Sequence, residues 1–158
     1  MKIRGFALLP LAALLFTACA SGRSGSAIYR RDIGTATRND AVNTGMQIIG
    51  RYGYEIFESD SVNQVRIITH WKQRRPFADE TALGVAAAES RITIVARPRG
   101  QTEMGAFYAV NIVIENRLRV GENPDWNEST NTALFRRWAD DVTSEYRRLV
   151  TNIGVRRY

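Results

Sequence analysis

The stretch AFYAVNIVIENRLRV, residues 106–120, decides the fold, because apolar and polar side chains alternate along most of its length. Successive side chains of a β-strand point to opposite faces of a sheet, so this period of two predicts one long strand. One face carries Tyr108, Val110, Ile112, Ile114 and Leu118. The other face carries Phe107, Asn111, Glu115, Arg117 and Arg119. One apolar face and one mixed face are typical of an antiparallel sheet that is covered on one side.

Three shorter strands are expected upstream, because β-branched and aromatic residues gather there between turn residues. They cover residues 54–58, 65–71 and 91–97. The turn residues at 59–61 join the first two strands into a hairpin, and Pro76 ends the second strand. Residues 76–88 are predicted to be a loop or a short helical turn.

Two helices are predicted, one before and one after the strands. The first begins near Thr37, with Thr37 or Asn39 as its N-cap, and ends at Gly50 and Gly53. The second covers about residues 132–152 and ends in a cluster of arginines, which suits the helix dipole. Its expected apolar face contains Leu134, Trp138, Val142, Leu149 and Ile153, with Phe135 and Tyr146 beside them. We expect Trp138 and Ile112 to be buried where this helix meets the sheet.

The predicted fold class is α+β. The order helix, four strands, helix most simply gives a two-layer sandwich, with an antiparallel sheet of about four strands and both terminal helices packed on one face. The length suits a single domain, expected over residues 36–158.

The N-terminal residues have the layout of a secretory signal peptide over residues 1–18. A short positive segment precedes an apolar run of about 11 residues, shorter than the roughly 20 that span a bilayer. Thr17 and Ala18 then precede Cys19, the single cysteine of the chain. This order resembles the lipobox of bacterial lipoproteins. The alternative is a free or buried thiol in a secreted protein.

The lipobox resemblance implies that Cys19 is the lipid attachment site. Its sulfur would carry a diacylglyceryl group and its freed amine a further acyl chain such as palmitate, and two or more chains hold a protein on a membrane stably. Ala20, rather than an aspartate, follows Cys19, which by the same resemblance favours the outer membrane, facing the periplasm. Residues 19–35 are rich in Ser and Gly and then basic, and they are expected to form a flexible tether.

The element order, together with the lipid signal, resembles the BamC-like helix-grip domains of bacterial envelope lipoproteins. That resemblance implies a role in the cell envelope.

The charge of the chain bears on its partners. Its formal net charge of +6 falls to +4 (6 − 2) when Lys2 and Arg4 leave with the signal peptide. The sequence pI near 10.0 would suggest nucleic acid for a cytosolic protein. An exported chain meets anionic head groups, lipopolysaccharide or acidic proteins instead, so we expect no nucleic-acid partner.

Sequence motifs for catalysis are missing. His70 is the single histidine, whereas a zinc site gathers several ligands, so we expect no metal and no cofactor. The chain contains neither G-x-S-x-G nor a phosphate-binding glycine motif. Residues 72–76, KQRRP, form a basic patch that could meet phosphate groups or an acidic partner, or could be a solvated loop.

The sequence therefore predicts a non-enzymatic envelope lipoprotein, an accessory or scaffold in envelope assembly or maintenance. The alternative is a carrier or sensor that binds a small apolar or lipid ligand between helices and sheet. We expect an envelope protein to dock on the mixed face of the sheet or on a free strand edge. The candidate contact residues are Phe107, Asn111, Arg117, Arg119 and Trp126, and Trp126 is either an exposed anchor or folded back onto the domain.

Overall fold

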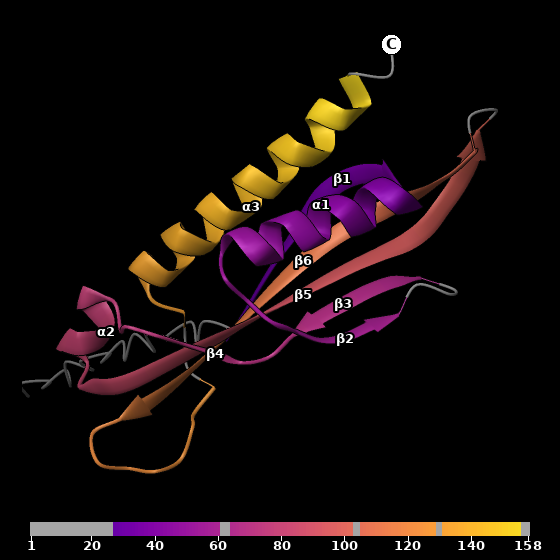
Figure 1. Cartoon of the computed structure of the whole chain (residues 1–158). Helices are drawn as coiled ribbons and strands as arrows, with labels where there is room; N and C mark the ends of the chain where they lie inside the picture. Colours follow the sequence, from indigo (N-terminus) through magenta and orange to yellow (C-terminus); the bar gives the residue numbers. More distant parts are fainter. Residues whose placement is uncertain (1–26, 61–63, 103–104, 129–130, 156–158) are drawn as a thin grey trace, which may run out of the picture.

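The computed structural model describes residues 27–60, 64–102, 105–128 and 131–155. Its elements are, in order, β1 (Ile28–Thr37), α1 (Arg38–Arg51), β2 (Ile56–Asp60), β3 (Val65–Thr69), β4 (Lys72–Arg74), α2 (Ala78–Ala82), β5 (Val85–Thr102), β6 (Gly105–Val120) and α3 (Ala133–Val155) (Figure 1). The strands form one antiparallel sheet in the order β1-β6-β5-β3-β2, and β4 also pairs with β5. The α+β class and the antiparallel sheet are confirmed, but the expected four strands are in fact six.

The first extra strand, β1, lies where the tether was expected. It pairs with β6 from Ile28, opposite Glu115, and its Tyr29 and Ile33 are buried. Residues 28–35 of the segment expected to be a tether therefore belong to the sheet, and residues 19–26 lie outside the described residues. Three consecutive charged residues and a register shift near Gly34 hide the alternation of this strand in the sequence.

The second extra strand arises because the expected strand over residues 65–71 is split. β3 ends at Thr69, and β4 begins at Lys72 and pairs with the first part of β5. β5 is also much longer than the expected residues 91–97. The uncertain segment 76–88 contains the short helix α2 and the start of β5.

The core lies between the sheet and the two long helices, α1 and α3, which run along the same side of the sheet (Figure 1). Of the two expected caps of α1, the structure selects Thr37, because its Oγ1 accepts a hydrogen bond from the backbone N–H of Asp40 at 3.3 Å. Gly45 lets α1 approach the sheet closely. A Cβ at this position would stand 3.2 Å from the Cδ1 atoms of both Ile67 and Ile94.

The buried face of α3 differs from the expected one. Its fully or nearly fully buried apolar residues are Phe135, Ala139, Val142, Tyr146 and Val150. Ile112 is fully buried as expected, whereas Trp138 and Leu149 only flank the core and Leu134 is exposed. The expected stripe is therefore wrong by a rotation of the helix. The rings of Phe135 and Tyr146 fill the space above the sheet, while the small side chain of Ala139 lies between them. The side chain of Ile153 lies outside the described residues.

Candidate docking site on the open face of the sheet

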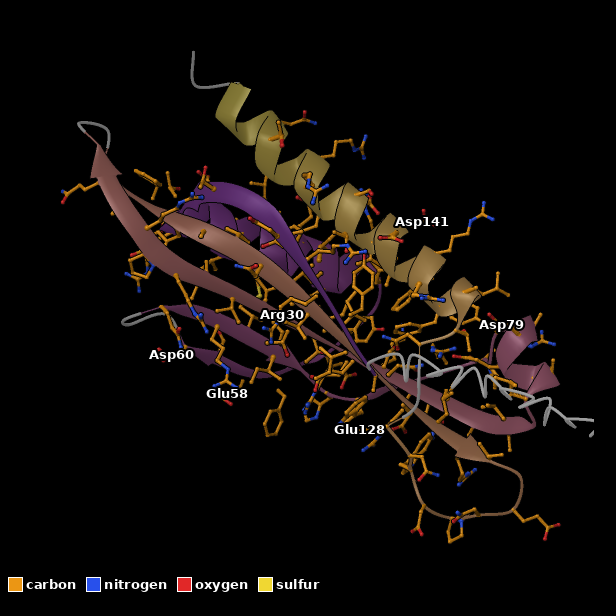
Figure 2. The ribbon with its side chains drawn as sticks, turned by 180° about the vertical axis from the view of Figure 1, so that it is seen from behind. Arg30, Glu58, Asp60, Asp79, Glu128 and Asp141 are labelled. Atoms are coloured by element: carbon orange, nitrogen blue, oxygen red, sulfur yellow. The ribbon has the colours of Figure 1, made fainter. Side chains whose placement is uncertain are left out.

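The face of the sheet opposite α1 and α3, here called the open face, carries the odd-numbered residues of β6. Viewed from behind, no described helix lies over it, and Arg30 lies on its edge strand β1 (Figure 2). Along β6 these odd-numbered residues are half-buried from Phe107 to Arg119, while the even-numbered ones from Val110 to Leu118 are buried. Half-burial on one side and full burial on the other is the pattern of a sheet with one solvated face.

The strand register determines which side chains are neighbours on this face. One row across β1, β6, β5 and β3 contains Arg30, Val113, Thr93 and Ile68. The next row contains Asp32, Asn111, Val95 and Arg66. Arginines therefore stand on both sides of a central strip of valines.

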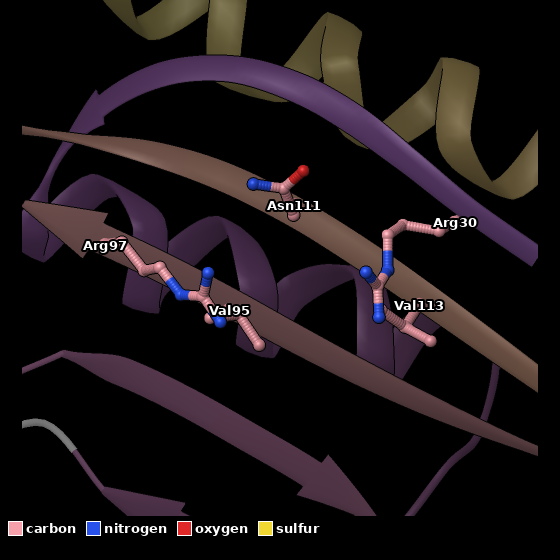
Figure 3. Close-up of a pocket in the computed structure, with 5 residues that line it drawn as sticks. All are labelled: Arg30, Val95, Arg97, Asn111 and Val113. Carbon is pink, nitrogen blue, oxygen red and sulfur yellow. The ribbon is translucent and has the colours of Figure 1, made fainter. Parts of the chain in front are cut away.

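A shallow depression of about 140 Å³ lies over this strip and is here called the arginine hollow. It is lined by Arg30, Val95, Arg97, Asn111 and Val113. Figure 3 shows Arg30 and Arg97 reaching into it from β1 and β5. A wider basin of about 430 Å³ shares much of this lining and extends to Arg66 and Arg91.

Three arginines of the hollow and the wider basin are not neutralised by ion pairs. Within the described residues, the guanidinium groups of Arg30, Arg66 and Arg97 have no carboxylate within 4.0 Å. The wider basin is lined by four arginines and one carboxylate, that of Glu115. Its surface is therefore positive around an apolar floor, which suits an anionic partner.

Other charges on the open face are paired or lie at its edge. Arg91 binds both carboxylate oxygens of Glu115, at 2.8 and 2.9 Å, and this hydrogen bonding raises the pKa of Arg91. Glu58 and Asp60 lie on the edge strand β2 (Figure 2), and Asp60 stands opposite Arg66 in the register. The open face therefore has a basic centre and an acidic edge.

The structure places all four candidate strand residues on the open face, but in different surroundings. Asn111 lines the arginine hollow. Phe107 packs over Gly100, where a Cβ would lie 3.0 Å from its ring. Arg117 and Arg119 lie toward the opposite end of β6, beyond Glu115.

The charge of Arg117 is already paired within the domain. Its Nε donates to Glu89 at 2.6 Å, and its guanidinium lies 4.2 Å from the ring centre of Trp71 and 5.0 Å from that of Trp126. Arg119 also stacks on Trp126, at 5.6 Å. Trp126 is therefore folded back onto the open face, which decides between its two expected positions.

Arg30, Arg66 and Arg97 are not among the site residues that the sequence predicts. Arg30 lies in the segment expected to be a tether, for which no face is predicted. Arg66 and Arg97 lie in expected strands, where their alternation with buried residues indicates the solvated side. Their meeting at one place follows only from the strand order β1-β6-β5-β3.

The basic patch at residues 72–76 is divided among different roles. Lys72 Nζ donates to the backbone oxygen of Tyr52, the C-cap residue of α1, at 2.6 Å. Arg74 is mostly buried and paired with Glu80. Only Gln73 and Arg75 of this segment are classed as exposed.

His70 is exposed, and its ring packs edge-on against Phe57 with centroids 5.0 Å apart. No three His, Cys, Asp or Glu side chains in the described ranges are grouped so as to hold a metal ion. None of the helices among these residues has the length and apolar composition needed to cross a membrane. Cys19 lies outside the described residues.

No protein-family model matches the chain, and no curated protein is significantly similar to it in sequence.

Proposed function

We propose that the chain is a lipid-anchored, non-enzymatic accessory or scaffold protein of the bacterial cell envelope, held on the outer membrane through Cys19 and facing the periplasm. Its two-layer domain, with the helices on one face of the sheet, would present the other face to a partner. The proposal joins the lipobox-like segment at Cys19 to the uncovered face of the sheet.

The observation that carries the docking role is the set of unneutralised arginines around the valines of the arginine hollow and the wider basin. Arg30, Arg66 and Arg97 come from three strands of one sheet, so their backbones are held at fixed spacing. Opposite charges on neighbouring strands stabilise a sheet when they pair, and like charges directly opposite each other destabilise it. Three arginines without an ion pair, above an apolar floor, favour a protein partner that brings carboxylates and a small apolar contact.

The contact area would extend along β6. Phe107 and Asn111 would lie on the side of the hollow, and Arg117, Arg119 and Trp126 would form the opposite border. Because Arg117 is already paired with Glu89, we expect it to position Trp126 rather than to meet a carboxylate of the partner.

Crosslinking in living cells tests this proposal. A photoreactive residue is placed at Asn111, and the matched control carries it at Arg137, an exposed position of α3. We expect Asn111 to give an adduct with one envelope protein that has an acidic segment. The adduct should disappear in a variant with Arg30→Glu and Arg97→Glu, because like charges would then face each other.

Two results would contradict docking at this face. One is an absence of adducts at Asn111 under conditions where the control protein is folded and membrane-bound. The other is an adduct that persists after both charge reversals or that forms equally from Arg137.

A further inference from the structure

A second depression, distinct from the arginine hollow, opens between the end of α1, β4 and α3. It has a volume of about 230 Å³ and is here called the aromatic pocket. It is lined by Tyr52, Tyr54, Lys72, Arg74, Arg75, Phe77 and Trp138. Its lining combines four aromatic rings with three cations and contains no carboxylate.

The aromatic walls are held in place by the core. Trp138 packs against Phe135, with ring centroids 5.4 Å apart, and Phe135 is fully buried. Tyr52 and Phe77 each lie 6.4 Å from Trp138, centroid to centroid. The rings of Tyr52, Phe77 and Trp138 are only half-buried, so they present apolar surface on a rigid frame, whereas Tyr54 is buried. Such a wall accepts an apolar group with little loss of side-chain entropy.

The cations of the pocket differ in their availability. The charge of Arg74 is balanced by Glu80. Lys72 donates to the oxygen of Tyr52 and lies 5.1 Å from the ring centre of Tyr54, but it has no carboxylate partner among the described residues. An ammonium group has three donors, so two remain. Arg75 is exposed and likewise has no ion pair within the described part of the chain.

Besides Glu80, two acidic residues of α3, Asp141 and Glu145, lie near the pocket, on its Tyr52 side. Glu145 accepts a hydrogen bond from the Tyr52 hydroxyl at 3.0 Å and pairs with Arg51. Burial and the charge of Asp141 raise the pKa of Tyr52. An anion would therefore enter on the side of Lys72 and Arg75, away from these carboxylates.

We propose that the aromatic pocket binds a phosphate group that is joined to an apolar group. The phosphate would lie between Lys72 and Arg75, and the apolar part would lie against Trp138, Tyr52 and Phe77. The volume is below the roughly 300–1,000 Å³ of a drug-sized site, so the pocket suits a head group and the first part of an apolar chain, or a single ring. This site is independent of partner docking on the open face.

Calorimetric titration of the whole chain, extracted in a non-ionic detergent, tests the proposal with defined probes. Dihexanoyl phosphatidic acid represents a lipid head group, and phenyl phosphate represents a soluble phosphate ester. Inorganic phosphate and hexanol each supply one half of the ligand. We expect one of the two combined probes to bind at least about tenfold more tightly than either half, since both contacts add. Which probe binds more tightly identifies the source of the phosphate.

Matched variants locate the binding. We expect Arg75→Gln to weaken the tighter probe about tenfold, the effect of losing one charge-assisted hydrogen bond. Trp138→Leu should weaken it while leaving inorganic phosphate unchanged. Arg99→Gln removes an exposed arginine elsewhere and should change nothing. The proposal is overturned if inorganic phosphate binds as tightly as both combined probes, if no probe binds, or if Arg75→Gln and Arg99→Gln behave alike.

Discussion

The guanidinium of Arg74 on β4 donates two hydrogen bonds to the carboxylate of Glu80 on α2, at 2.7 and 2.5 Å. Glu80 is completely buried and also accepts from the backbone N–H of Phe77 at 2.8 Å. Arg74 donates further to Asn116 of β6 at 2.9 Å and lies 4.5 Å from the ring centre of Phe77. This ion pair therefore fixes β4 and α2, and with them one wall of the aromatic pocket, against the sheet.

Glu80→Gln should destabilise the domain by about 3–5 kcal/mol, because it leaves the charge of Arg74 buried without its counter-ion. Equilibrium unfolding in urea measures this. Replacing both partners by methionine should recover much of the loss, since no buried charge then remains. Glu58→Gln, on the exposed strand β2, is the control and should stay within about 0.5 kcal/mol of wild type. Equal unfolding midpoints for Glu80→Gln and Glu58→Gln would contradict the structural role of the pair.

The buried face of α3 can be tested by truncating neighbouring apolar side chains. Phe135 is 0% exposed and Leu134 is 37% exposed. Phe135→Ala should cost about 3–5 kcal/mol, the usual range for a fully buried aromatic residue. Leu134→Ala should cost much less, and Trp138→Ala an intermediate amount because Trp138 only flanks the core. If Trp138→Ala proved more damaging than Phe135→Ala, the helix would be rotated as the sequence first suggested.

The elements that could be predicted from the sequence are those with a local signal. The alternation over residues 106–120 and the capping residue Thr37 each act within a few neighbours, and both matched the structure. β1 has no such signal, because three charged residues follow one another in its middle. Arg30 and Asp32 point to the open face, whereas Arg31 shares the other face with the buried Tyr29 and Ile33. The face of α3 was ambiguous for another reason. The apolar side chains of this helix form an arc wider than the buried stripe, so packing against the sheet selects which of them are buried.

The candidate site was predictable only in part. Alternation along β6 was enough to put Asn111, Arg117 and Arg119 on the same side of the strand. The pairing of Arg117 with Glu89 depends on the register between β5 and β6, and a slip of one residue would send one of the two to the other face. The arginine hollow depends on strand order, which brings Arg30 near Arg97 although 67 positions (97 − 30) separate them. No local pattern encodes that approach.

Two glycines of α1 should respond in opposite directions to added side chains. Gly45→Val should destabilise the domain by about 1–3 kcal/mol, because the new atoms would overlap Ile67 and Ile94. Gly50 has open space around it, so Gly50→Ala should stabilise the helix by about 0.5–1 kcal/mol through reduced backbone entropy. Thermal unfolding of both variants measures the difference. A neutral effect of Gly45→Val would mean that α1 does not lie as close to the sheet.

The lipid anchor is tested by Cys19→Ser, which removes the thiol that acylation needs. We expect this variant either to be released from membranes or to keep its signal peptide, whereas wild type should partition with membranes because its acyl chains bury many CH₂ groups. Membrane fractionation followed by mass spectrometry distinguishes these outcomes. An unmodified thiol at Cys19 in a mature wild-type chain would refute the anchor.

Alkaline pH should destabilise the domain through its buried tyrosines. Burial raises the pKa of Tyr146, and burial also raises that of Tyr54 against the smaller opposing effects of Ser90 and Arg74. Above pH 10, the ordinary tyrosine pKa, the unfolded chain loses these phenolic protons while the folded chain keeps them. The unfolded state then binds fewer protons, so stability falls as pH rises, with the full contribution present below pH 10.

Tyr146→Phe isolates one of these groups. At neutral pH it should cost little, because the Tyr146 hydroxyl donates a long hydrogen bond, 3.4 Å, to the Ala41 carbonyl oxygen. Above pH 10 the variant should lose stability less steeply than wild type, by up to about 1.4 kcal/mol per pH unit for a single titrating group. Urea unfolding between pH 8 and about 11 measures both slopes. Parallel curves for wild type and Tyr146→Phe above pH 10 would show that Tyr146 ionises as readily in the folded chain as in the unfolded one. The burial of Tyr146 between α3 and the sheet would then be wrong.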